Sequence, residues 1–101
     1  MKSTKAAIYA RADNDQDLKT QIALLKQTIR NNGCTIGKTG IYSDIGKPAE
    51  GLHAILRDVG IGNFKVLYLT YNNMPEIDRQ LVKQAVQTIY AHGLSAIVVS
   101  S

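Results

Sequence analysis

The stretch Ala6-Ala7-Ile8-Tyr9-Ala10-Arg11-Ala12-Asp13-Asn14-Asp15-Gln16-Asp17 decides the fold of this chain. Its first five residues are almost wholly apolar, which is typical of a short buried strand. Polar, turn-prone residues follow at once and lead into a helical pattern that begins near Asp17. In a strand–helix unit of a parallel sheet, sites are usually built at this junction, the carboxyl end of the strand.

Three amphipathic helices are predicted from apolar residues that recur every three or four positions. The first runs from about Asp17 to Asn32 and is capped by Asp15 or Asp17. The second is closed by Gly60 and Gly62. The apolar stripes consist of Leu18, Ile22, Leu25 and Ile29 in the first helix, Leu52, Ile55, Leu56 and Val59 in the second, and Ile77, Leu81, Ala85, Val86 and Ile89 in the third.

Four strands alternate with these helices, at residues 6–10, 34–42, 65–70 and 96–99, and residues 43–50 are predicted to form a loop. Continuous apolar strands that alternate with amphipathic helices indicate an α/β fold, with a parallel sheet covered by helices on both faces. We predict a flavodoxin-like sheet with the strand order 2-1-3-4. The order reverses between the first and third strands, so a site is expected where loop 11–16 meets loop 70–76.

Length, charge and cysteine content narrow the class of protein. The chain has 101 residues, 45% of them hydrophobic, so residues 1–101 are expected to form a single domain. The formal charge of +4 is compatible with nucleic acid, although the twelve Lys and Arg residues are scattered. A lone Cys34 excludes an internal disulfide, and no apolar run is long enough to span a membrane. We therefore expect a cytoplasmic protein with no membrane partner.

Two polar motifs near the predicted loops have competing interpretations. Gly33-Cys34-Thr35-Ile36-Gly37-Lys38-Thr39 looks like a phosphate loop, but it is one residue too short and lies within a predicted strand. Asp13, Asp15 and Asp17 suggest a metal or phosphoacceptor site, yet carboxylates at a helix N-terminus are explained equally well by capping. We favour capping and expect neither a metal ion nor a cofactor.

Several short motifs occur in a consistent order along nearly the whole chain. They are Ile8-Tyr9-Ala10-Arg11, then Asp17-Leu18 with Gln21, Asn32-Gly33, Ile41-Tyr42-Ser43-Asp44, Gly51-Leu52, Phe64-Lys65-Val66-Leu67 and His92-Gly93-Leu94. This series resembles the catalytic domain of serine recombinases, the resolvase/invertase group. The resemblance implies the flavodoxin-like fold and a history of site-specific DNA recombination. Members of that group cut DNA with a serine that becomes joined to the 5′ phosphate, and arginines stabilise the transferring phosphate.

The residues that the resemblance places at the reaction centre are largely missing. Arg11 matches the first arginine of the group, but Asp13 stands near the position of the expected serine. The other arginines fall on Ala49 and on the segment 73–77, which contains none. Gln16 and Gln21 match polar positions near the site. The resemblance thus implies Arg11 and Asp13 as a vestigial catalytic pair, and Arg11, Gln16 and Gln21 as contacts to DNA phosphates.

We therefore expect a resolvase-like domain that is not an active enzyme and that acts by protein–protein or weak DNA interaction. Its expected partners are a second copy or an intact recombinase. Relative to the group, the chain up to Ser101 lacks the long dimerisation helix and the helix-turn-helix domain. One alternative is a non-covalent DNA-binding or regulatory protein of a mobile element. Another is the binding of a small anion or nucleotide in the flavodoxin-like crevice.

Overall fold

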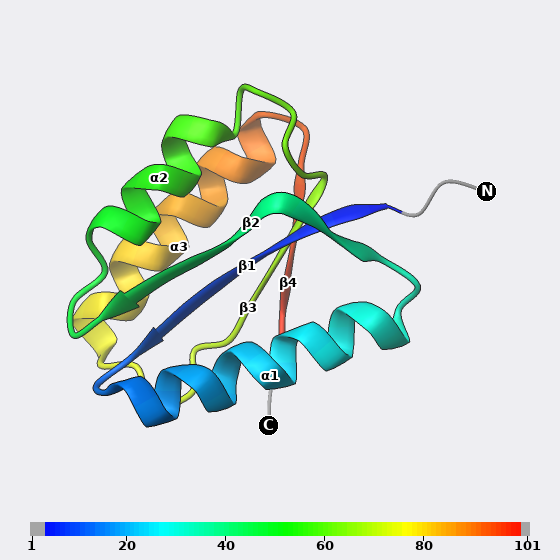
Figure 1. The fold of residues 1–101 in the computed structure, drawn as a ribbon. Helices are drawn as coiled ribbons and strands as arrows, with labels where there is room; N and C mark the ends of the chain where they lie inside the picture. The colour runs from blue at the N-terminus through cyan, green and yellow to red at the C-terminus, as the bar shows by residue number, and fades with distance from the viewer. Residues whose placement is uncertain (1–3, 100–101) are drawn as a thin grey trace.

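The computed structural model describes residues 4–99, apart from the side chains of Lys38 and Thr39. Strands and helices alternate strictly along the chain (Figure 1). The elements are β1 (Lys5–Ala12), α1 (Asp15–Asn31), β2 (Thr35–Ile45), α2 (Glu50–Asp58), β3 (Val66–Leu69), α3 (Glu76–Ala91) and β4 (Ser95–Val98). In the described part of the chain, no helix is both long and apolar enough to cross a membrane.

The four strands form one parallel sheet in the order β2-β1-β3-β4, which confirms the predicted flavodoxin-like arrangement. Both central strands are fully buried over most of their length, as continuous apolar runs require. The order reverses between β1 and β3, and Ile8 of β1 pairs with Tyr68 of β3. The carboxyl ends of these two strands therefore lie side by side, where the site was expected.

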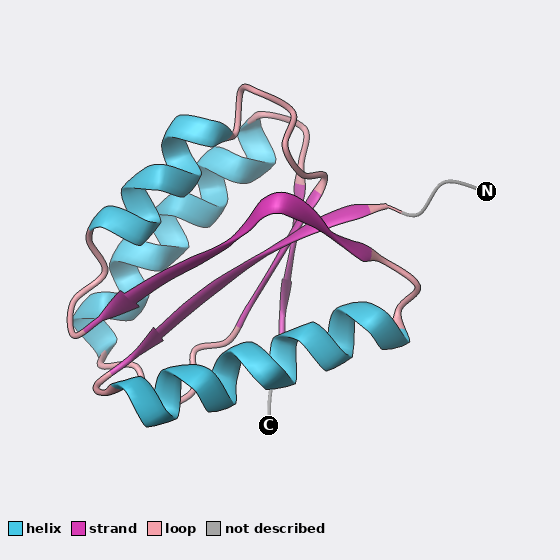
Figure 2. Cartoon of the chain, in the orientation of Figure 1, coloured by secondary structure: helices cyan, strands magenta, loops and turns pink. Residues whose placement is uncertain are grey.

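Helices cover both faces of the sheet, with α1 on one side and α2 and α3 on the other (Figure 2). Beneath α1 lies a core cluster that contains Leu25 and Ile29 of the helix with Ile8 and Tyr68 of the strands. The larger cluster lies under α2 and α3 and contains Tyr9 and Ile55, among others. Because β1 alternates between these clusters, Arg11 lies on the same face as Tyr9, toward α2 and α3.

The first helix begins two residues earlier than predicted, and its cap is a different residue. Asn14 is the N-cap, and its side-chain oxygen accepts a hydrogen bond of 2.9 Å from the backbone N–H of Asp17. Capping by Asp15 or Asp17 is therefore wrong. These two carboxylates lie in the first helical turn instead, where the helix dipole favours negative charge.

Two further expectations are corrected by the structure. Residues 43–45 continue β2 to Ile45, because their backbone pairs with β1 from Ala10 to Ala12. In α3, Ile77 and Leu81 are 72% and 43% exposed, so they are not part of the buried stripe. That stripe consists of Asp78, Val82, Ala85, Val86 and Ile89. Because Asp78 is acidic but lies on the buried face of α3, the hydrophobic pattern alone did not identify that face.

Candidate functional site at the carboxyl end of the first strand

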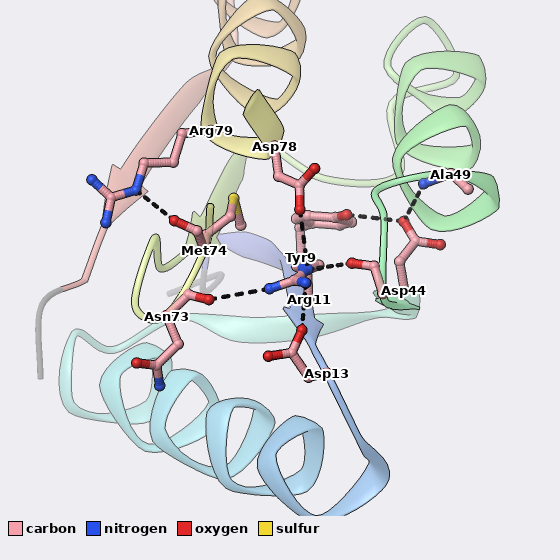
Figure 3. A network of polar contacts seen from close by, with 10 residues as sticks. Tyr9, Arg11, Asp13, Asp44, Ala49, Asn73, Met74, Asp78 and Arg79 are labelled. Carbon is pink, nitrogen blue, oxygen red and sulfur yellow. Dashed lines mark hydrogen bonds and ion pairs between the residues drawn. The ribbon is translucent and has the colours of Figure 1, made fainter. Parts of the chain in front are cut away.

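Arg11 lies near the end of β1 and is only 4% exposed. Its guanidinium is surrounded by four acceptors, one from the turn directly after β1 and three from more distant parts of the chain (Figure 3). One amino nitrogen donates to the Asp13 carboxylate at 2.6 Å, and the other donates to the Asn73 carbonyl at 3.2 Å. Nε donates to the Gly46 carbonyl and lies 3.6 Å from the Asp78 carboxylate. The arginine is thus held from several directions by the protein itself.

Asp78 is a residue of the candidate site that the sequence analysis did not predict. It lies in the first turn of α3 and is 4% exposed, with its carboxylate directed toward Arg11 (Figure 3). A buried carboxylate is stable only when it is paired or hydrogen-bonded. One signal in the sequence could have revealed it. Asp78 precedes Val82, Ala85 and Val86 at helical spacing, which places an acid on the buried face.

Asp13 stands near the position where the family resemblance implies the nucleophilic serine. Its side chain is 69% exposed and forms the ion pair with Arg11. With Asp78, the cluster holds one positive and two negative formal charges. A phosphate that approached Arg11 would have to displace a carboxylate at 2.6 Å and would meet another behind it. This arrangement favours an internal ion cluster over an open anion site.

No described serine lies beside the Arg11 side chain. Ser43 is on β2 opposite Ala10, so strand alternation turns its side chain to the α1 face, away from Arg11. Ser95 begins β4 at the amino edge of the sheet, whereas Arg11 is at the carboxyl edge. Within residues 4–99, the geometry therefore supplies no serine hydroxyl next to the guanidinium.

Asp44 of β2 organises the wall of the site next to α2. Its carboxylate accepts the backbone N–H groups of Ala49, Gly51 and Leu52 at 2.9–3.1 Å, which satisfies orphan donors at the start of the helix. It also accepts the Tyr9 hydroxyl at 2.9 Å. A Cβ added to Gly51 would lie 2.5 Å from the Ser43 carbonyl oxygen, so only glycine fits this close approach. The motifs around Asp44 and Gly51 thus have a structural explanation.

Tyr9 links the core to this polar wall. Burial raises the pKa of the Tyr9 hydroxyl well above its usual value of 10.0, and the Asp44 carboxylate raises it further. The hydroxyl is therefore a permanent donor to Asp44 at any physiological pH. Because the protonated Tyr9 hydroxyl cannot accept a proton from a substrate, its role is to position the Asp44 carboxylate.

The two glutamines implied as phosphate contacts lie apart. Gln16 is exposed in the first turn of α1, whereas Gln21 is 9% exposed and faces the sheet. The side-chain oxygen of Gln21 is buried without a hydrogen-bond partner in the described part of the structure. Beside Gln21, a crevice of about 150 Å³ separates α1 from the loop after β3; it is lined by Asp17, Thr20, Gln21, Leu24, Asn72 and Asn73. That lining contains no cation.

The loop after β3 completes the site through its backbone. Asn73 has a positive φ of 58°, a conformation that asparagine tolerates better than most residues, and its carbonyl faces Arg11. Arg79 is close by in sequence and half-buried, but its Nε donates to the Met74 carbonyl at 3.0 Å (Figure 3). Tyr71, in the same loop, packs toward α3, with Lys83 Nζ 6.0 Å from its ring centre.

Comparisons with known proteins agree with the fold. The structure is similar to the C-terminal catalytic domain of ISC1926 TnpA, an IS607-like serine recombinase, with a TM-score of 0.76 and 19% identity; the match covers 96% of this chain and 70% of the other. It is also similar to the first ORF in transposon ISC1904 from Sulfolobus solfataricus P2, with a TM-score of 0.66 and 15% identity over 98% and 69% of the two chains. No protein-family model and no curated protein matches the sequence.

The fold is thus that of a serine-recombinase catalytic domain, as the order of the sequence motifs implied. At these identities the likeness describes the backbone arrangement and leaves the chemistry to the residues of the site. In the described residues, no three His, Cys, Asp or Glu side chains are grouped so as to hold a metal ion.

Proposed function

We propose that this chain is a recombinase-like domain that does not cleave DNA and that acts through contacts with other protein chains. The observation that carries the proposal is that the Arg11 guanidinium is already paired with acceptors of its own chain. All four of its neighbours are acceptors from the chain itself, and two of them are carboxylates. Phosphoryl transfer to a serine requires a nucleophile beside cations that are free to stabilise the phosphate.

The aspartate near the position of the missing serine supports the same conclusion. A carboxylate at 2.6 Å from the guanidinium occupies the fork that would otherwise receive a phosphate oxygen. A single arginine would also have to neutralise the whole charge of the transition state. The Arg79 side chain, held by the hydrogen bond from its Nε to the Met74 carbonyl, points away from Arg11 (Figure 3), and the lining of the nearby crevice contains no cation.

The direct test is a search for a covalent protein–DNA adduct. Purified protein is incubated with supercoiled and nicked DNA, including the ends of related transposons, and is resolved on a denaturing gel. We expect no adduct and no strand cleavage. Asp13→Ser, which places a hydroxyl at this position, is expected to remain inactive because the other arginines are still missing. An adduct of the unaltered protein, on any serine or aspartate, would overturn the proposal.

Non-covalent DNA binding is a second candidate, favoured by one surface feature. Lys19, Lys26 and Arg30 are all exposed on α1. At 3.6 residues per turn, they fall within a sector of about 40° around the helix axis. Three cations in line can contact backbone phosphates without reading sequence. The stripe lies on the outer side of α1 and does not depend on Arg11.

Salt dependence tests this second candidate. Fluorescence anisotropy with a labelled duplex should give weak binding whose logarithm falls with the logarithm of salt, with a slope of about −3 for three neutralised phosphates. Lys26→Ala should reduce the magnitude of the slope by about 1, whereas Lys65→Ala, an exposed lysine just before β3, should leave it unchanged. Salt-independent binding, or equal effects of the two substitutions, would eliminate the α1 stripe as the contact.

Binding of a small anion in the crevice is the least supported candidate. The crevice between α1 and the loop after β3 lies at the point where the strand order reverses, which is the usual place for a ligand. Its polar groups are amides, a hydroxyl and the Asp17 carboxylate, and Arg11 is engaged elsewhere. Titration with inorganic phosphate or a nucleotide, followed by NMR, should therefore leave the resonances of Gln21 unchanged.

A further inference from the structure

The outer edge of β4 is an exposed, apolar part of the sheet. In the described chain, β4 pairs with β3 on one side and with no strand on the other. Ile97 is 38% exposed and Val98 is 48% exposed. The sequence from Gly93 to Val99 contains no charged residue and no proline. Natural edge strands are normally protected by short length, charge, proline, a bulge or a covering segment; β4 is short, with four residues, but has no charge, proline or bulge.

The backbone of β4 presents a short, regular set of unpaired groups. The N–H groups of Ser95 and Val99 donate to the carbonyls of Lys65 and Leu69 on the β3 side, at 3.0 and 2.7 Å. In a parallel strand, every second residue directs both its N–H and its C=O to the same neighbour. Ala96 and Val98 therefore direct theirs away from β3, toward the open edge.

Both faces of this edge are apolar. Ile97 pairs with Tyr68, which faces α1, and Val98 pairs with Leu69, which faces α3. Strand alternation therefore places Ile97 on the α1 face and Val98 on the α3 face.

The other edge of the sheet is different. The register of β2 on β1 shifts between Ala6 and Ile8, which marks an irregularity in the strand. Gly40 lies within this irregular part, where an added Cβ would be 2.8 Å from the Ile36 side chain. Bulges of this kind twist an edge away from pairing, and the Asp44 carboxylate further along β2 is committed to α2. The register of β2 is regular only from Ile41 to Ile45, a stretch that includes the charged Asp44, whereas β4 is regular throughout and uncharged.

We propose that β4 pairs antiparallel with β4 of a second copy of this chain, about a two-fold axis at Ile97. In this register, Ala96 lies opposite Val98 of the second copy, and the outward N–H and C=O groups form two hydrogen-bonded pairs. Ile97 then faces its own counterpart in the close, non-hydrogen-bonded position. The result is a continuous eight-stranded sheet, twice the four strands of one chain.

A second copy fits this edge better than a partner of different chemistry. The edge is self-complementary, because the same strand supplies the matching hydrogen-bond groups and apolar side chains on both faces. Each copy carries a formal charge of +4. Because segment 93–99 is uncharged, no like charges would face each other across the two paired strands. The same lack of charge gives a polyanion nothing to contact there.

The strength of the dimer follows from its size. A pairing between strands of four residues lies at the small end of specific interfaces, below about 1,000 Å². We expect dissociation constants between about 10 μM and 1 mM, so the dimer forms only at high local concentration. The inference rests on the proposed function in one respect, because it names a partner for a domain that acts through protein contacts.

Concentration-dependent sedimentation of the 101-residue chain tests for the dimer. We expect a monomer–dimer equilibrium, with slower hydrogen exchange at the Ala96 and Val98 amides as concentration rises. Ile97→Lys should weaken association at least about tenfold, because like charges would face each other across the axis. Ile77→Lys, at a more exposed isoleucine on α3, is the matched control and should have no effect. Circular dichroism verifies that both variants are folded.

Disulfide trapping tests the register. In a Cys34→Ser background, Ile97→Cys should cross-link two chains under mild oxidation, because β-carbons in a close antiparallel pair are about 5 Å apart. Ile77→Cys should cross-link at least about tenfold more slowly, since it lies outside the proposed interface. A monomer at every concentration, or equal trapping of the two cysteines, would overturn the dimer. A covalent DNA adduct would overturn the proposed function and leave this result unaffected.

Discussion

Arg11 on β1 is 4% exposed and surrounded by acceptors from its own chain, whereas Ile97 on β4 is 38% exposed on a strand with an open edge. The first region is charged, and its hydrogen-bonding groups are satisfied internally. The second is uncharged, and its outward backbone groups have no partner strand in residues 4–99. The polar groups around Arg11, where this fold usually places a site, are thus already paired, whereas the backbone groups at the outer edge of β4 are unpaired in the described residues.

This contrast indicates which of the two regions can gain free energy by binding a partner. A buried arginine that is already paired gains little from a phosphate, because it must first give up a carboxylate. An unpaired strand edge gains hydrogen bonds and apolar burial from any matching strand. Substitutions around Arg11 should therefore affect stability strongly, and substitutions at the open edge should affect association while leaving the monomer nearly unchanged.

The largest effect is expected at the buried carboxylate beside Arg11. Asp78→Ala should lower the free energy of unfolding by about 3–5 kcal/mol, because a buried guanidinium then loses its buried ionic partner. Asp13→Ala removes the 69%-exposed carboxylate and should cost no more than about 1 kcal/mol. Urea unfolding followed by circular dichroism measures both. Equal losses would show that Arg11 is not held mainly from the core side.

A smaller but clear loss is expected at the carboxylate that joins β2 to α2. Asp44→Ala leaves the first backbone N–H groups of α2 and the Tyr9 hydroxyl without their acceptor. We expect a loss of about 2–3 kcal/mol, from the cap and the buried hydroxyl together. Asp15→Ala, in the exposed first turn of α1, is the control and should cost a few tenths of a kcal/mol. A loss below 1 kcal/mol for Asp44→Ala, as for a surface charge, would contradict this role.

The raised pKa of Tyr9 predicts a dependence of stability on alkaline pH. Above about pH 10, the unfolded chain releases the Tyr9 proton while the folded chain retains it, so stability is complete below pH 10 and declines above it. One such group contributes a decline of about 1.4 kcal/mol by pH 11. Unfolding midpoints at about pH 8 and pH 11 should therefore differ less in Tyr9→Phe than in the unaltered protein. Identical declines would show that Tyr9 ionises normally in the folded chain.

The smallest effect on the monomer is expected at the open edge. Ile97→Thr should change the unfolding free energy by no more than about 0.5 kcal/mol in dilute solution, because the side chain is already partly in water. The same substitution at Ile8, which is fully buried on β1, should cost more than about 2 kcal/mol. A large monomer loss at Ile97 would mean that this edge is part of the folded core, and the comparison with Arg11 would fail.

Much of the fold could be predicted because each element has its own local signal. Apolar runs such as residues 65–70 mark buried strands, and spacings of three and four mark helices, as at Leu25 and Ile29. Alternation of the two leaves few topologies, since crossovers between parallel strands are right-handed. The errors lie where tertiary contacts override local pattern. Residues 43–45 extend β2 because β1 pairs with them, and Asp78 is buried because Arg11 neutralises it.

The sequence predicted a candidate site at the carboxyl end of the first strand, but the surroundings of Arg11 could not be predicted from the sequence. The sequence by itself determined the strand order, the position of Arg11 at the end of the first strand, and the absence of a serine after it, because these depend on residue order and local periodicity. Only the tertiary structure decided that Arg11 is enclosed by Asp78, Gly46 and Asn73, and that Ile97 is left at an open edge. Those features depend on contacts between residues far apart in the chain, which no local pattern encodes.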